Sequence, residues 1–116
     1  MEYKYKSLTT RLYFIRLDGF MIVTSCEKVA GGKLVKLELE HDGSRIKRAK
    51  LTGDFFMYPE DALPKIENSL VGLRISDIDS AEVRIAELID SNAIQLIGFS
   101  AETIAKLAKD AVGESK

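Results

Sequence analysis

The chain has 116 residues and a formal net charge of −1, with 17 lysines and arginines against 18 aspartates and glutamates. This length suffices for one domain with a modest core. The balanced charge excludes an overall field that would recruit nucleic acid or an anionic membrane, so a charged partner must meet a local patch. The single cysteine, Cys26, excludes an intramolecular disulfide and a cysteine-based metal cage, which favours a cytoplasmic location.

The first 25 residues mix aromatic and aliphatic side chains with basic ones. One interpretation is a hairpin, with residues 11–17 paired to residues 20–24 around the Asp18-Gly19 turn. The other is that Met21 is the physiological start and the first twenty residues are an extension. The apolar runs here are split by charged residues and fall short of the ~20 residues of a membrane span. No small-residue cleavage site follows them, so a signal peptide is not predicted.

The clearest element is a strand over residues 34–40, where Val35, Leu37 and Leu39 alternate with charged residues. Residues 41–44 have the composition of a turn and include the only histidine. Residues 45–52 then form a second, antiparallel strand with its inward positions at Ala49 and Leu51. After Gly53-Asp54, residues 55–58 form either a third short strand or an extended connection.

Three amphipathic helices follow. The first begins at Pro59, whose missing N–H is not needed in a first turn, and ends at Gly72. The second runs from residues 79–82 to Ser91-Asn92, and the third is capped by Ser100 and ends at Gly113. The positions predicted to be buried are Ala62, Leu63, Ile66 and Leu70 in the first helix, Val83, Ile85, Ala86 and Ile89 in the second, and Ile104, Leu107, Ala108 and Ala111 in the third.

Gly31-Gly32-Lys33 has the residue types of a phosphate-binding loop. The spacing does not match, because no glycine stands five residues before the Gly32-Lys33 pair and the required Ser or Thr is replaced by Leu34. We therefore interpret residues 31–33 as a connection that leads into the strand over residues 34–40.

Gly53-Asp54-Phe55-Phe56 places a carboxylate beside two aromatic rings, an arrangement that can hold an adenine or a partner's aromatic side chain. In an extended segment the two rings point to opposite faces, so we expect one in the core and one exposed.

The remaining candidates favour structural roles. The basic strand residues Arg45, Lys47, Arg48 and Lys50 could contact nucleic-acid phosphates, but Glu38 and Glu40 on the facing strand can neutralise them. His41 has no catalytic or metal-binding partner at a motif spacing and is predicted to lie in the turn. Only Lys28 is close enough in sequence to lower the pKa of Cys26, so no reactive thiol is predicted.

Taken in order, several of these motifs resemble the small C-terminal accessory domain of lipoate-protein ligases, most specifically between Glu27 and Val71. The matching features are Lys28, Gly31-Gly32-Lys33-Leu34-Val35, Asp42-Gly43, Ile46, Gly53-Asp54-Phe55-Phe56, Tyr58-Pro59-Glu60, Ala62-Leu63, Ile66-Glu67 and Leu70 to Gly72. The chain departs from the family because it lacks the arginine and triple-glycine segment of the lipoate pocket and the length of the catalytic domain. The resemblance therefore implies an archaeal-type, two-chain ligase.

In that family the catalytic domain uses ATP, Mg and lipoate to form lipoyl-adenylate, then lipoylates a lysine of an acceptor protein. The resemblance implies that this chain binds none of these alone, docks on the catalytic subunit as a heterodimer, and orders its adenylate-binding loops. It implies no nucleic acid, no membrane, no metal site and no catalytic residue here. Whether the acid is lipoate or octanoate stays open. The candidate interface residues are Lys33, Asp54, Phe55, Phe56 and Tyr58.

The same resemblance implies a two-layer α+β fold, a small antiparallel sheet with helices on one face, similar to the sulfur-acceptor and iron-sulfur-scaffold folds. The hairpin and three amphipathic helices independently require this layering. Residues 1–26 are predicted to be an N-terminal extension and residues 27–116 the accessory domain. Two other functions stay open: a small single-stranded nucleic-acid-binding module using the residue 45–50 strand and the N-terminal aromatics, and a free-standing sulfur or metal carrier using Cys26.

Overall fold

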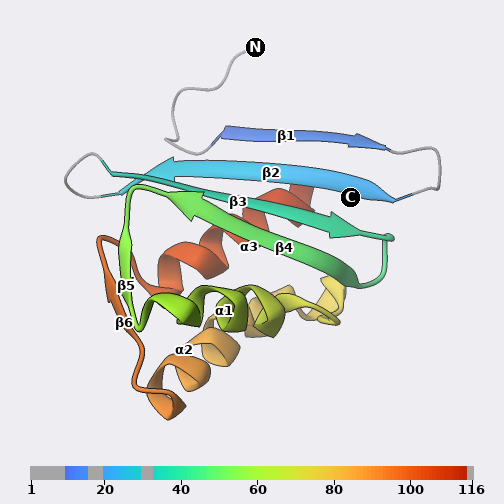
Figure 1. The fold of residues 1–116 in the computed structure, drawn as a ribbon. Helices are drawn as coiled ribbons and strands as arrows, with labels where there is room; N and C mark the ends of the chain where they lie inside the picture. The colour runs from blue at the N-terminus through green and yellow to red at the C-terminus, as the bar shows by residue number, and fades with distance from the viewer. Residues whose placement is uncertain (1–9, 16–19, 30–32, 115–116) are drawn as a thin grey trace.

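A four-stranded antiparallel sheet forms one layer of the molecule (Figure 1). The computed structural model describes residues 10–15, 20–29 and 33–114, with the backbone alone for residues 10–15 and 114. Strands β1 (Thr10–Ile15), β2 (Met21–Lys28), β3 (Leu34–His41) and β4 (Ile46–Gly53) lie in chain order, each paired with the next. The predicted hairpin of the third and fourth strands is confirmed.

The N-terminal hairpin is also confirmed over the described residues. β1 pairs with β2 in a register that runs from Thr10 opposite Cys26 to Ile15 opposite Met21. β2 pairs with β3 along its whole length, from Met21 opposite His41 to Lys28 opposite Leu34. β2 passes through residue 26 without a break. The division of the chain into an extension, residues 1–26, and a domain, residues 27–116, stays a prediction, as does a physiological start at Met21.

One face of the sheet is buried because its strands alternate apolar and polar residues. Val35, Leu37 and Leu39 of β3 are almost fully buried, as are the predicted inward residues Ala49 and Leu51 of β4. Their neighbours in sequence lie on the other face, which no helix covers in the part of the chain that the structure describes (Figure 1).

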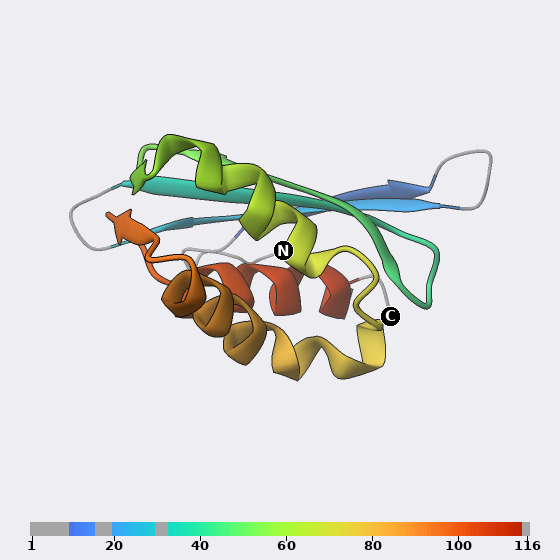
Figure 2. The same ribbon diagram turned by 60° about the horizontal axis from the view of Figure 1, so that its bottom comes forward.

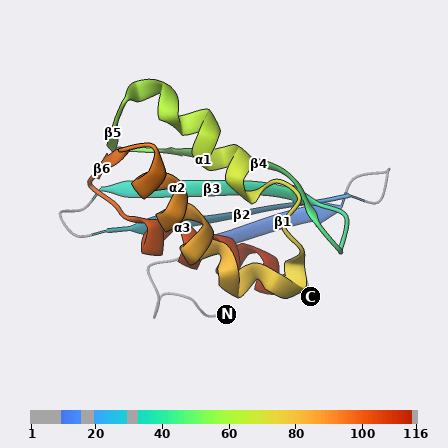
Figure 3. The same ribbon diagram turned by 90° about the horizontal axis from the view of Figure 1, so that it is seen from below.

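The helices form the second layer, with one helix set further out. α1 (Leu63–Leu70) packs on β4, and α3 (Ala101–Glu114) packs on β2 and β3. α2 (Ala81–Ser91) packs on α1 and α3, on the side away from the sheet (Figures 2 and 3). Short 3-10 turns, η1 (Glu60–Ala62) and η2 (Ile75–Ser80), precede α1 and α2. The α+β class with helices on one face of an antiparallel sheet is therefore confirmed.

The outer position of α2 explains two wrong predictions. Val83 and Ala86 were expected in the core, but both are exposed, Val83 by 59%. Only Ala81 and Ile85 of α2 are fully buried, and Leu88 and Ile89 are half-buried against the core, because the sheet lies behind the other helices. Helical periodicity identifies an apolar face but not how much of it is covered. Gly113 also lies within α3, which continues to Glu114.

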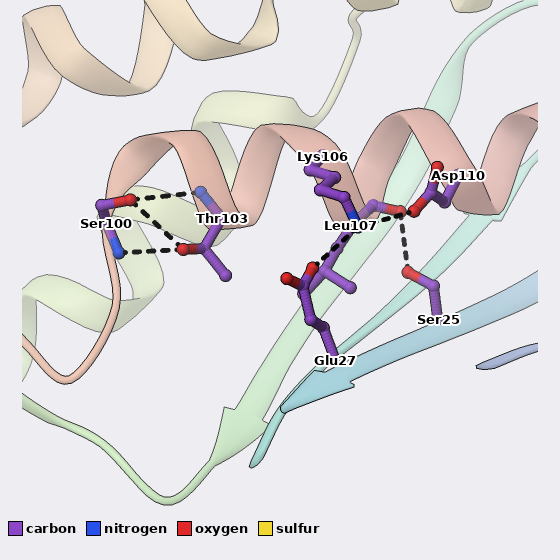
Figure 4. A network of polar contacts seen from close by, with 7 residues as sticks. All are labelled: Ser25, Glu27, Ser100, Thr103, Lys106, Leu107 and Asp110. Carbon is purple, nitrogen blue, oxygen red and sulfur yellow. Dashed lines mark hydrogen bonds and ion pairs between the residues drawn. The ribbon is translucent and has the colours of Figure 1, made fainter. Parts of the chain in front are cut away.

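Two sets of polar contacts hold the helices on the sheet. The Ser25 hydroxyl, fully buried on β2, donates a hydrogen bond of 2.7 Å to the Leu107 carbonyl of α3, and Lys106 pairs with Glu27 at 3.0 Å (Figure 4). Ser100 caps α3 as predicted, through a 3.3 Å bond from the Thr103 N–H to its hydroxyl. On β4, an edge strand, the Leu51 N–H donates to the Glu67 carboxylate of α1 at 2.8 Å. The bonds of Ser25 and Leu51 satisfy polar groups that would otherwise be left without a partner in the interior or at its edge.

The turn between β3 and β4 is closed by Asp42, whose carboxylate accepts hydrogen bonds from the Arg45 and Ser44 N–H groups, both at 2.9 Å. These bonds lower the pKa of Asp42 to about 2.

The prediction that His41 lies in the turn was wrong: it is the last residue of β3, and its side chain is only 2% exposed. Its Nδ1 atom accepts a 3.0 Å bond from the Gly43 N–H. Burial lowers the pKa of His41, and the negative charge of Asp42 opposes the effect.

The lowered pKa of His41 predicts a loss of stability in mild acid. Below pH 6.5, its ordinary pKa, the unfolded chain binds a proton that the folded state resists, so the free energy of unfolding should fall as the pH decreases. His41→Asn keeps an acceptor for the Gly43 N–H but cannot titrate. Urea unfolding of both proteins between pH 8 and pH 5 should give a smaller decrease for the variant; equal decreases would contradict this role of His41.

Candidate functional site

The end of the sheet where β4 finishes is shaped by a close backbone approach. Gly53 has a φ of +148°, and a Cβ atom at this position would overlap the Leu34 carbonyl oxygen. The same oxygen accepts a 2.8 Å hydrogen bond from the Asp54 N–H. Only glycine combines this φ with this proximity. The bond and the missing side chain together direct the chain out of the main sheet and into β5.

β5 (Phe56–Tyr58) forms a separate two-stranded antiparallel sheet with β6 (Gln95–Ile97) at this end of the molecule (Figure 1). Of the two possibilities for residues 55–58, the short strand is confirmed. β6 was not predicted, although the apolar residues Ile94, Leu96 and Ile97 stand between Asn92 and Gly98, a pattern typical of a short strand. The site therefore includes residues that sequence reasoning missed.

The expected division of the two phenylalanines is confirmed. Phe55 is half-buried, and its ring lies against Phe99 with centroids 4.3 Å apart and an interplanar angle of 31°. Phe56 is 65% exposed. The first ring anchors the segment before β5 to the segment after β6, and the second is available to a partner.

The solvent-facing side of this small sheet carries a group of large side chains. Phe56 lies opposite Ile97 and Tyr58 opposite Gln95, while between them Met57 is buried in the core and Leu96 is half-buried against it. Tyr58 is 52% exposed and Ile97 43% exposed. We call the surface formed by Phe56, Tyr58, Gln95 and Ile97 the β5–β6 outer face. It is apolar and aromatic, the composition enriched at the centre of protein interfaces.

Two charged candidates lie at the same end of the molecule. Lys33 immediately precedes β3 and Asp54 follows β4, and both are exposed. Neither side chain makes an ion pair or hydrogen bond with the described residues. Gly31 and Gly32 lie outside the described residues. Lys33 leads into a strand, whereas a phosphate-binding loop leads into a helix, so this element lacks the helix N-terminus that such a loop uses.

A small cleft lies between β5 and the start of α1. Its volume is about 210 Å³, and it is lined by Phe55, Phe56, Met57, Tyr58, Glu60 and Leu63. Small-molecule sites usually occupy ~300–1,000 Å³. Of the two ligands suggested by the sequence, the size of this cleft favours a partner's side chain over an adenine nucleotide.

The other sequence candidates lie elsewhere. On the open face of the sheet, Arg48 pairs with Glu38 at 2.8 Å and with Glu40 at 3.5 Å, as expected, and Lys47 pairs with Asp42 at 3.5 Å. Cys26 is half-buried on β2.

No group of three or more metal-binding side chains occurs in the described part of the chain. No helix there is long and apolar enough to cross a membrane.

Comparison with known proteins gives two matches to the same system. The chain is 44% identical over 46 residues to lipoate-protein ligase A subunit 2 of Thermoplasma acidophilum. The fold matches a chain in the solved structure of an archaeal lipoylation system, a bi-partite lipoate protein ligase and its E2 lipoyl domain from the same organism, with a TM-score of 0.62. The resemblance to a lipoate-protein ligase accessory subunit is confirmed. No family model matches the chain.

The two matches differ in extent. The sequence match covers 40% of this chain and 49% of the relative, so the matched segment spans about half of that protein's length. The structural match covers 85% of this chain and 97% of the solved chain, at 23% identity, and therefore concerns the fold. The likeness thus extends in three dimensions well beyond the segment that is similar in sequence.

Substitution of Gly53 should test the close approach at the end of β4. Gly53→Ala combines an unfavourable φ with an overlap on the Leu34 carbonyl, and should lower the free energy of unfolding by at least ~3 kcal/mol. Gly43→Ala has a φ of +89° but no atom within 4 Å of the new methyl group, and should cost about 1 kcal/mol. Chemical denaturation measures both, and similar values would refute the proposed overlap.

The two phenylalanines should differ sharply in their effect on stability. Phe55→Ala removes the contact with Phe99 and part of the core, at a cost of about 2–3 kcal/mol, because this ring is half-buried. Phe56→Ala changes an exposed position and should stay within about 0.5 kcal/mol of the wild type. If thermal unfolding shows the reverse order, the assignment of an anchoring and an available ring is wrong.

Proposed function

We propose that this chain is the non-catalytic subunit of a bipartite lipoate-protein ligase and that it docks on the catalytic subunit through the β5–β6 outer face. The observation that carries the proposal is the exposure of Phe56, Tyr58 and Ile97 on one small sheet. Large aromatic side chains at the centre of an interface supply most of its binding energy. The relationship to a ligase subunit supplies the identity of the partner.

The charged residues beside this face would form the rim of the interface. Lys33 and Asp54 have opposite charges, are exposed, and lie next to the backbone contact that fixes β5. Rim charges change binding energy little but set orientation and association rate. Phe55, packed on Phe99 behind the face, would hold the segment that carries Phe56 and Tyr58 in place.

The contribution to the reaction would be positional. ATP, Mg and lipoate would bind to the catalytic subunit, and this chain would hold its adenylate-binding loops in the productive arrangement for lipoyl-adenylate formation. The complex would be a cytoplasmic heterodimer that then transfers the lipoyl group to a lysine of an acceptor protein. We assign no catalytic residue to this chain: His41, its only histidine, is buried at the far end of β3 in a bond to its own turn.

No specific observation favours the two alternative functions. A nucleic-acid surface on β4 would require free cations, but Arg48 is engaged by two glutamates and the Arg45 guanidinium donates to the Gly72 carbonyl at 2.9 Å. A sulfur or metal carrier would require an accessible cysteine with suitable neighbours, and Cys26 is half-buried in a strand.

Lipoyl-adenylate formation by the catalytic subunit, with and without this chain, tests the proposal. We expect activity only with both chains. Phe56→Ser combined with Tyr58→Ser should weaken the complex about 100-fold, because two aromatic residues at an interface centre commonly contribute ~1–2 kcal/mol each. At saturating concentrations of the variant, much of the activity should return.

The matched control is Val71→Ser, which changes an apolar residue that is 41% exposed at the opposite end of the sheet. It should bind and activate as the wild type does. Full activity of the catalytic subunit alone, with no association between the two chains, would refute the proposed function. Equal losses in the double variant and the control would refute the docking face.

A further inference from the structure

A second apolar surface lies on the other side of β6. It is a groove of about 640 Å³ between α2, β6 and the start of α3. The half-buried side chains of Ile89, Leu96 and Phe99 contribute to its lining, together with the exposed Val83 and Ala86 of α2. These last two are the residues that helical periodicity assigned to a core. The apolar face of α2 is thus longer than the part that α1 and α3 cover.

The charges of the groove have one sign. The charged residues that line it are Glu87 and Asp90, both exposed, and neither carboxylate forms an ion pair with the described residues. They lie on the same face of α2 as Val83 and Ala86, at helical spacings of three and four residues. The C-terminal end of α2 adds negative partial charge near Asp90. Arg84, on the same helix, is directed elsewhere and donates to the Ser69 carbonyl at 3.3 Å.

The dimensions suit a helix. From Val83 to Asp90 the groove follows α2 for about 10 Å, which is roughly two helical turns. Amphipathic helices bind such grooves through apolar residues spaced three and four apart, and their flanking charges pair with the rim. A rim of two carboxylates that pair with none of the described residues, beside an apolar floor, therefore selects a helix with lysine or arginine beside its apolar stripe.

The groove and the β5–β6 outer face lie on the two sides of the same strand, β6. Leu96 lines the groove, while its neighbours Gln95 and Ile97 belong to the outer face. A partner that covers β6 would meet both surfaces. We infer that the groove receives a basic amphipathic helix of the catalytic subunit, so that the two chains meet on both sides of β6. This inference rests on the proposed function, because it names a second contact of the same partner.

Charge reversal tests the inference in the purified two-chain complex. Glu87→Lys and Asp90→Lys should each weaken binding of the catalytic subunit about tenfold in 50 mM salt, and the loss should shrink in 500 mM salt because screening weakens the lost ion pairs. The matched control is Glu82→Lys, an exposed carboxylate on the same helix that does not line the groove. Calorimetry should give the control an unchanged dissociation constant.

A second variant tests the apolar floor independently of charge. Ala86→Trp would fill the groove from an exposed position and should weaken binding at all salt concentrations, whereas Val71→Trp, at an exposed position that does not line the groove, should not. Thermal unfolding of the free subunit shows whether each variant is folded. Wild-type affinity in Glu87→Lys, Asp90→Lys and Ala86→Trp would overturn the inference.

The outcomes separate this inference from the proposed function. If the Phe56→Ser and Tyr58→Ser variant loses binding while the groove variants keep it, the docking face stands and the groove inference fails. If the wild-type chain does not bind the catalytic subunit at all, both fail. If the groove variants bind normally but slow transfer to the acceptor protein, or lose a self-association seen by ultracentrifugation, the groove serves a different occupant and the inference is overturned.

Discussion

The contact between Gly53 and the Leu34 carbonyl determines where the candidate site can form. A side chain at Gly53 would displace this oxygen, and the oxygen in turn holds the Asp54 N–H at 2.8 Å. Because the backbones of β3 and β4 meet here, the chain leaves the main sheet at a fixed point and β5 begins beside it. The aromatic residues that follow are then presented on a rigid base, which lowers the entropy cost of binding a partner.

β6, the second strand of the small sheet, is positioned by α3, the helix that follows it in the chain. α3 is fixed on β2 by the buried bond from Ser25 to Leu107 and by the pair of Lys106 with Glu27. Its capped start at Ser100 directly follows Phe99, which packs on Phe55. The core of the domain therefore holds β5 and β6 from both ends, and leaves only their outer side chains exposed. This arrangement connects the packing of α3 to the geometry of the proposed interface.

Local patterns predicted much of this architecture, because strand alternation and helix capping depend on neighbours in sequence. Leu37 and Leu51 were recognised as inward-facing, and Ser100 as a cap. The errors arose where tertiary position decides exposure. Val83 has the spacing of a core residue but lies on a helix in an outer layer, and His41 looks like a turn residue but closes a buried strand. β6 has only three residues, too few for a clear period, and its pairing with β5 joins residues about 40 positions apart in the sequence, from Tyr58–Gln95 to Phe56–Ile97. The sequence therefore indicated half of the site, and the fold supplied the rest.

Hydrogen–deuterium exchange of this chain, alone and bound to the catalytic subunit, tests the central claim most directly, because it locates the contact without any substitution. The account predicts that exchange slows in the segments that contain β5 and β6, Phe56–Tyr58 and Gln95–Ile97, while the turn at Gly43 exchanges at the same rate in both states. Protection confined to the open face of the four-stranded sheet, with β5 and β6 unchanged, would contradict it.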